Sequence, residues 1–123
     1  MVDPEHIAEL EKNGVKFSKE KLVATGRLPD GKVFFLEEGT KASGLRHIVD
    51  KHGSEFEKKG IAQSDIPKVI RQALSEGKIV GYQGEGTGRP IFQTTVNGSE
   101  LNIAITVSEN GYIVGANMRG ARK

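Results

Sequence analysis

The chain contains no cysteine. Disulfide bonds, thiolate nucleophiles and cysteine-based zinc sites are therefore excluded. Without cysteine the sequence carries no mark of the redox compartment in which the protein works. A protein that must cross a cell envelope loses nothing by this absence.

Tryptophan is also absent, and aromatic residues make up only 6% of the chain. A platform of stacked aromatic side chains for single-stranded nucleic acid is therefore poorly supplied. Three aromatic residues of the C-terminal half remain candidates for contacts with a base: Tyr82, Phe92 and Tyr112.

Long apolar runs are lacking as well. None approaches the roughly 20 residues that a membrane helix needs, and the N-terminus has no apolar core of a signal peptide. We therefore expect no membrane anchor and no export signal in the chain. Its 123 residues, 36% hydrophobic and 28% charged, predict a single soluble globular domain with one modest core.

The positive charge is unevenly placed along the chain. The formal net charge is +2, and residues 1–77 are electrically balanced, so the whole excess follows residue 77. Arg119, Arg122 and Lys123 stand at the end. This asymmetry is a weak indication of a polyanionic partner, and a solvated basic tail would explain it equally well.

The N-terminal segment has the start and stop signals of a helix. Asp3 and Pro4 suit the N-cap and the first helical position, and Asn13-Gly14 is a typical end. We expect His6 to lie on the surface of this helix.

A β-hairpin is predicted next. Strand-like segments at residues 21–28 and 32–36 flank Pro29-Asp30-Gly31. Proline presets φ and glycine supplies a positive φ in such a turn. The helix and the hairpin make up a predicted N-terminal part, residues 1–43.

Two of the three histidines share one predicted helix, from about residue 45 to residue 52, with Gly53 as its stop. One stripe of this helix has the spacing of a core-facing side, and His52 belongs to it. His47 and Lys51 lie near each other on the opposite flank. The residues of the stripe are Leu45, Ile48, Val49 and His52.

A second helix and four strands follow. Ser64-Asp65-Ile66-Pro67 starts the helix and Gly77 closes it, with an apolar stripe between them. Strands are predicted at residues 78–83, 89–96, 99–108 and 112–117, because Asn97-Gly98 and Asn110-Gly111 are strong hairpin signals. The glycine-rich residues 84–88 lack the Lys-Ser/Thr of a phosphate-binding loop and precede a strand, so we interpret them as a mobile hairpin loop. The apolar stripe of the helix comprises Ile66, Val69, Ile70, Ala73 and Leu74.

The two turns set a register in which one sheet face is apolar and the other polar. Counting places Arg89 opposite Thr106, and Gly115 leaves room beside Thr106. A face turned to water usually carries lysine and glutamate. The side chains found here hydrogen-bond phosphate groups well, so we favour a binding face. Its members are Arg89, Gln93, Asn102, Thr106 and Asn117.

The histidine spacing suits acid–base chemistry better than metal binding. His47 and His52 are five residues apart, whereas a helical zinc pair needs a spacing of four, so we expect no metal and no other cofactor. In a ribonuclease-type transphosphorylation, a base removes the proton of the 2′-hydroxyl, cations and donors hold the phosphorane, and an acid protonates the leaving oxygen. Side chains of the required types accompany the histidines: Arg46, Lys51, Arg89 and Thr106.

The segment Gly44-Leu45-Arg46-His47-Ile48, followed by Lys51-His52-Gly53-Ser54-Glu55-Phe56 and a sheet with Arg89 and Thr106, resembles the barnase/EndoU/colicin/RelE group of ribonuclease toxin domains. It is similar in particular to colicin D-like tRNases and to the C-terminal toxin domains of contact-dependent growth-inhibition effectors. The similarity covers residues 44–118, the predicted catalytic core. It implies a small α+β domain that cleaves RNA, often tRNA, without a metal.

The resemblance also implies roles. His52 would be the base with Lys51 beside it, while His47 fits the G-L-x-H-I pattern of related nucleases, so either histidine remains the candidate essential one. A hydroxyl on a central strand would be Thr106 or Ser108. The chain departs from the colicin D pattern because that strand lacks a tryptophan.

We therefore predict an α+β fold with helices packed on one face of a twisted, mainly antiparallel sheet, and a metal-independent tRNA endonuclease toxin. The first alternative is a non-catalytic module that binds RNA or protein through the polar face. The second is another enzyme class such as an ADP-ribosyl transferase, for which no motif is found. The predicted catalytic residues are His52, His47, Thr106, Arg89 and Lys51, and the predicted substrate-binding residues are Arg46, Gln93, Asn102, Asn117 and Ser108.

The expected partners are tRNA or another RNA and a cognate immunity protein, with a translation factor of the host cell as a further partner to consider. By the same resemblance the domain would act in the cytoplasm of a target bacterium. It would be delivered as the C-terminal part of a larger secreted or cell-surface effector.

Overall fold

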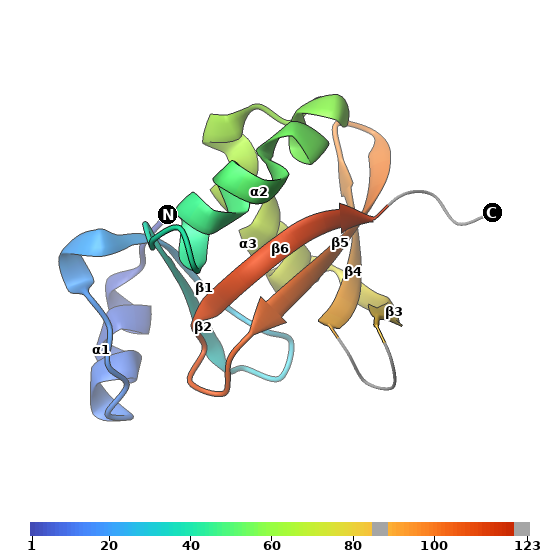
Figure 1. Ribbon diagram of the computed structural model, residues 1–123. Coiled ribbons are helices and arrows are strands. Elements are labelled where there is room, and N and C mark those ends of the chain that lie inside the picture. Colours follow the sequence, from blue (N-terminus) through green and yellow to red (C-terminus); the bar gives the residue numbers. More distant parts are fainter. Residues whose placement is uncertain (85–88, 120–123) are drawn as a thin grey trace.

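The computed structural model describes residues 1–84 and 89–119. Over these residues the fold is α+β, with three α-helices, a two-stranded and a four-stranded sheet, both antiparallel, as predicted (Figure 1). Short 3₁₀ turns at Lys19–Lys21 and Gln63–Asp65 precede β1 and α3. The elements are α1 Pro4–Lys12, β1 Leu22–Arg27, β2 Val33–Glu37, α2 Gly44–Lys58, α3 Ile66–Glu76, β3 Lys78–Gln83, β4 Arg89–Val96, β5 Ser99–Val107 and β6 Ile113–Arg119.

The N-terminal helix and the hairpin are confirmed. The Asp3 side chain caps α1 by accepting from the backbone N–H of Glu5 at 2.8 Å. Strands β1 and β2 pair antiparallel around the predicted turn. Arg27 of β1 ties the hairpin to α1 through Glu9, 2.8 Å away, and this hydrogen bond lowers the pKa of the Glu9 carboxyl.

His6 is buried, so its predicted surface position is wrong. Its ring Nδ1 lies 2.8 Å from the hydroxyl of Thr25, which is itself fully buried on β1. The backbone N–H of Asp3 donates to the same hydroxyl at 2.9 Å. Because the hydroxyl already accepts from Asp3, it can donate its own proton to His6, and this chain of bonds satisfies the buried ring.

Helix α3 and its stripe are confirmed, and they hold the hairpin and the large sheet together. All five predicted stripe residues are buried. The helix packs on β1 on one side and on β4 on the other, while α2 runs along β6 (Figure 1). Side chains from both helices, the hairpin and the sheet form one core that includes Phe34, Ile48, Phe56, Ile70 and Ile103.

Helix α2 is longer than predicted and passes through Gly53 to Lys58. The reason lies in Phe56, which stands one turn beyond His52 on the core-facing stripe and is fully buried. Burial of an aromatic side chain contributes about 2–3 kcal/mol, which exceeds the cost of about 1 kcal/mol for a glycine inside a helix. Gly53 is accordingly not among the residues with positive φ.

The β4–β5 hairpin follows the predicted register up to a limit. Asn97 and Gly98 have φ of 52° and 81°, as a two-residue turn with positive φ at both positions requires. Gln93 pairs with Asn102 and Ile91 pairs with Ala104, as counted.

Counting on from the same turn places Pro90 opposite Ile105 and Arg89 opposite Thr106, but neither of these two pairs forms. Between the described strands the β4–β5 ladder ends at Ile91. Proline has no N–H to donate, and from this point β4 follows β3 instead, with Pro90 opposite Tyr82. A bulge in β3 between Ile79 and Gly81 adds to the local twist.

The β5–β6 hairpin has the predicted register at Thr106, but its turn differs from the predicted one. Ser108 N–H donates to the Tyr112 carbonyl at 2.8 Å, so three residues form the turn instead of two. A bulge between Thr106 and Val107 then shifts the pairing by one residue. Thr106 therefore stands opposite Gly115, as predicted.

Candidate active site

The polar face of the four-stranded sheet is concave. Asn117 of β6 donates to the side-chain carbonyl of Gln83 of β3 at 3.0 Å, although β4 and β5 separate these strands in the sheet. A flat sheet would hold them about 14 Å apart. The sheet is therefore strongly curled, and in Figure 1 the β3–β4 pair crosses the direction of the β5–β6 pair.

Two arginines meet two amides on this concave face. Arg89 Nη1 donates to Asn117 Oδ1 at 2.8 Å, and Arg119 Nη1 donates to Gln83 Oε1 at 3.2 Å. Within residues 1–84 and 89–119 neither guanidinium pairs with a carboxylate. The amides orient the two cations without neutralising them, which leaves their charge for an anion.

His47 and Arg89 come together over Gly115. A Cβ atom at Gly115 would lie 3.7 Å from Cδ2 of His47 and 3.8 Å from Nη2 of Arg89. The glycine thus leaves a space that the imidazole and the guanidinium border from two sides. Thr106 is the cross-strand partner of Gly115 and lies beside this space on the same face.

The ring of His47 is held in one tautomer. Its Nδ1 lies 2.9 Å from the backbone carbonyl of Lys41, which can only accept, so Nδ1 carries the proton. In the neutral ring Nε2 then has the free electron pair. The adjacent atom Cδ2 faces Gly115 and Arg89, so this edge of the ring faces the concave site.

His52 stands next to His47 and is also held at Nδ1. The carboxylate oxygen Oε2 of Glu55 lies 2.7 Å from this nitrogen, and Oε1 of the same group accepts from the backbone N–H of Met118 at 3.1 Å. The two imidazole rings meet edge to face, with centroids 6.5 Å apart. The side chain of His52 is 27% exposed at the edge of the core, and within the described residues its only hydrogen bond is the one made by Nδ1.

Other predicted residues lie beside the site or away from it. Lys51 is exposed one helical turn after His47. Arg46 is exposed and pairs with Asp50 on α2 at 3.7 Å. Ser108 hydrogen-bonds Asn110 in the β5–β6 turn, so Thr106 is the hydroxyl that reaches the site.

The amides of Gln93 and Asn102 satisfy one another. Gln93 Nε2 donates to Asn102 Oδ1 at 3.2 Å, on the concave face but nearer the Asn97-Gly98 turn. Asn102 also stands opposite Arg119 in the β5–β6 ladder. This pair extends the polar surface beyond the histidines.

Sequence reasoning missed three members of the site: Glu55, Gln83 and Arg119. Glu55 follows His52 at a helical spacing of three, which is a signal for a side-chain contact. Continued counting along β6 would have placed Arg119 opposite Asn102. No local signal marks Gln83, because its contact with Asn117 depends on the curl of the whole sheet.

Within the part of the chain that the structure describes, no three or more His, Asp or Glu side chains gather to hold a metal ion. In the same residues no helix is long and apolar enough to cross a membrane. Residues 85–88 of the loop predicted at residues 84–88, and the basic residues Arg122 and Lys123, lie outside the described residues.

The comparisons with known proteins add no relative. No protein-family model matches the chain, and no match is found among curated proteins.

Proposed function

We propose that this protein is a metal-independent ribonuclease whose acid–base pair is His47 and His52. One observation carries the proposal. Each ring has its Nδ1 bound to an oxygen acceptor, the two rings lie edge to face with their centroids 6.5 Å apart, and Arg89 borders the same space as His47. Two oriented imidazoles, beside a guanidinium that pairs with no carboxylate of residues 1–84 and 89–119, are the groups that cleavage of a phosphodiester requires.

The reaction is an internal transfer of the phosphoryl group. The 2′-oxygen of the ribose attacks the phosphorus, and its proton passes to Nε2 of one imidazole. The bond between phosphorus and the 5′-oxygen breaks, and the second imidazole, which enters the step protonated, gives its proton to that oxygen. The products are a 2′,3′-cyclic phosphate and a free 5′-hydroxyl.

The concave face supplies the groups that stabilise the transition state. Arg89 and Arg119 carry positive charge to the non-bridging oxygens of the phosphorane, and the amide of Asn117 fixes the Arg89 guanidinium in place. The hydroxyl of Thr106, beside Gly115, is a further donor. Because protein groups hold these side chains before substrate arrives, little reorganisation is needed during the reaction.

The motif in α2 supports a narrower proposal. Its resemblance to tRNase toxin domains favours transfer RNA as the substrate and a cognate immunity protein as an inhibitor that covers the concave face. Under this proposal the domain acts in the cytoplasm of a target bacterium, to which a larger effector delivers it.

The decisive experiment incubates the purified protein with labelled transfer RNA in the presence of EDTA. Cleavage should persist and leave 2′,3′-cyclic phosphate ends. His47→Ala and His52→Ala should each lower the rate on the order of 10²–10⁴-fold. Lys68→Ala, which removes an exposed cation of α3, should leave it unchanged.

Two outcomes would contradict the proposal. Loss of cleavage on chelation would overturn the metal-independent mechanism. Binding of RNA without cleavage, equally strong in the two histidine variants, would instead favour the non-catalytic binding module that uses the polar face.

A further inference from the structure

A cavity of about 830 Å³ opens beside the candidate active site. It lies where β4 and β5 separate, between this part of the sheet and the tip of the β1–β2 hairpin. Its walls are mainly apolar, with Leu28, Ile79, Phe92, Ile105 and Val107 among them. A cavity of this size and character is typical of a site for a small molecule or for part of a larger ligand.

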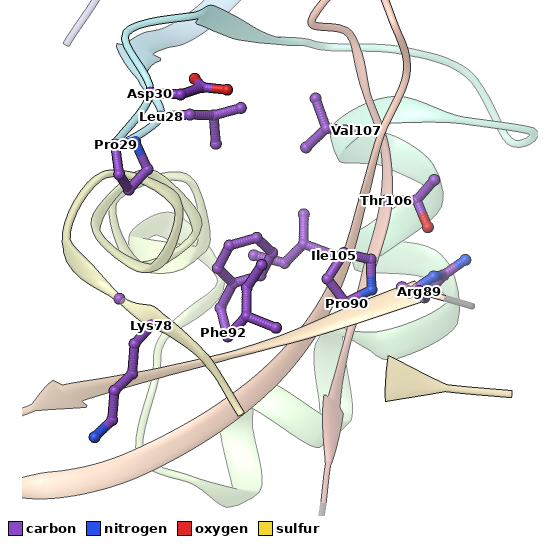
Figure 2. A pocket seen from close by; sticks show the side chains of 12 residues that line it. Leu28, Pro29, Asp30, Lys78, Arg89, Pro90, Phe92, Ile105, Thr106 and Val107 are labelled. Atoms are coloured by element: carbon purple, nitrogen blue, oxygen red, sulfur yellow. The ribbon is translucent and has the colours of Figure 1, made fainter. Parts of the chain in front are cut away.

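The rim of the cavity continues into the active site. Arg89 and Thr106 line it at the end opposite Pro29 of the hairpin tip (Figure 2). The same Arg89 borders the space over Gly115 together with His47. Lys78 also lines the cavity, with its ammonium group directed away from the interior (Figure 2), and Asp30 adds one carboxylate.

This distribution of charge matches a nucleotide. A nucleotide combines a flat, largely apolar base with an anionic phosphate, and here an apolar interior is joined to a cation at the rim. Phe92, which is buried at the wall, offers an aromatic ring to a base.

We propose that the cavity receives the base of the nucleotide next to the cleaved phosphate, and that it makes the enzyme selective among bases. The inference rests on the proposed ribonuclease function. Arg89 then contacts the phosphate, while the base occupies the apolar interior. The shape of the cavity and the carboxylate of Asp30 discriminate between bases, because a polar group left unpaired in such a pocket is costly.

The apolar wall alone would also suit a protein segment. Ile79, Val80 and Tyr82 of edge strand β3 are each about half exposed, at 49%, 47% and 49%, and an exposed apolar edge can pair with a partner strand. The continuity of the rim with Arg89 favours the nucleotide, and the protein segment becomes an outcome of the test.

The test is a titration of the methyl-labelled full chain, followed by NMR, with each of the four ribonucleoside 3′-monophosphates. Methyl signals of Leu28, Ile79 and Ile105 should shift, and the four nucleotides should differ in affinity. Inorganic phosphate, which has no base, should move signals near Arg89 and Gly115 without moving the cavity methyls.

A matched pair of variants locates the base. Ile79→Asp places a charge in the cavity wall and should weaken binding of the preferred nucleotide roughly tenfold or more. Val80→Asp makes the same change at an equally exposed neighbour that does not line the cavity, and should leave binding unchanged.

Three results would overturn the inference. Nucleotides could shift only the NMR signals around Gly115, or Ile79→Asp could bind the nucleotide as tightly as the wild type. An extended apolar peptide could also shift the methyl signals of the cavity while no nucleotide does. Failure of the ribonuclease proposal would look different. In that case base-dependent shifts in the cavity would persist, while no RNA is cut by the wild-type chain.

Discussion

His47 and His52 differ in the group that holds each ring. A neutral carbonyl, that of Lys41, accepts from His47, whereas the carboxylate of Glu55 accepts from His52. A carboxylate stabilises positive charge on an imidazole while it orients the ring, and a carbonyl chiefly orients it. We therefore expect His47 to act as the base and His52 to act as the acid.

Glu55→Gln tests this division of labour. The glutamate accepts one hydrogen bond from His52 and one from the N–H of Met118, each with a different carboxylate oxygen. Glutamine has only one side-chain oxygen, so it can replace only one of these acceptors. The rate should fall about tenfold or more, and the free energy of unfolding should fall by about 1 kcal/mol.

A comparison of turnover with stability separates this role from a purely structural one. At a temperature at which both proteins are folded, Glu55→Gln should lower kcat while KM stays close to the wild-type value, because the group affected is in the acid–base pair. If the folded variant turns over at the wild-type rate while stability alone drops, Glu55 has no part in the chemistry.

Gly115 offers a second test at the same scale. A Cβ there would make ordinary contacts of 3.7–3.9 Å with His47 and Arg89, so Gly115→Ala should fold normally and retain most activity. Gly115→Leu should fill the space over the glycine and lower the rate about 10²-fold, because the reacting groups are displaced.

The control for this pair is the melting temperature. Gly115 is buried beneath His47 and Arg89, so the leucine variant should melt at a lower temperature than the wild type, and the two rates are compared at a temperature at which both proteins are folded. Full activity in Gly115→Leu would place the reacting phosphate elsewhere.

At the scale of the elements, the sharpest prediction concerns helix α2. Gly53 lies inside the helix, and a Cβ there would meet only Val49 Cγ1, at 3.6 Å. Gly53→Ala should therefore raise the free energy of unfolding by about 0.5–1 kcal/mol, measured by urea denaturation. Gly60, which follows the helix with φ of 83°, is the control, since alanine there should destabilise.

Local signals in the sequence predicted most of the elements. Asp3-Pro4, Pro29-Asp30-Gly31 and Asn97-Gly98 each have a backbone requirement that few other residues meet, so the helix start and both hairpins followed. The helix end predicted at Gly53 was wrong, because the burial of Phe56 in the core outweighed the local preference of glycine for a helix end.

The candidate site was partly predictable for the same reason. The register placed Thr106, Gly115 and Asn117 correctly, since side chains alternate along a strand. The contacts of Arg89 and Gln83 with Asn117 could not be predicted from the sequence. They depend on the separation of β4 from β5 and on the curl of the sheet, which several strands determine together.

For the whole molecule, the curl of the sheet is what assembles the site. His47 and His52 come from α2, Arg89 from β4 and Gly115 from β6, and Gln83 and Asn117 hold the two edges of the sheet together. No single hairpin or helix contains the site. Loss of the tertiary packing should therefore abolish activity while much of the secondary structure survives.

The strand order has a consequence for folding kinetics. Each strand of the large sheet pairs with the strand that precedes it in the chain, in the order β3-β4-β5-β6. Such a meander needs only short loop closures, which speeds folding. We expect the main refolding phase after dilution from urea to occur on the order of milliseconds, and stopped-flow fluorescence of Tyr82 and Tyr112 would measure it. A dominant phase of many seconds would show that the curled sheet forms through a slow rearrangement. Under the proposed delivery by a larger effector, rapid refolding of this kind would restore an active conformation before proteases reach the chain.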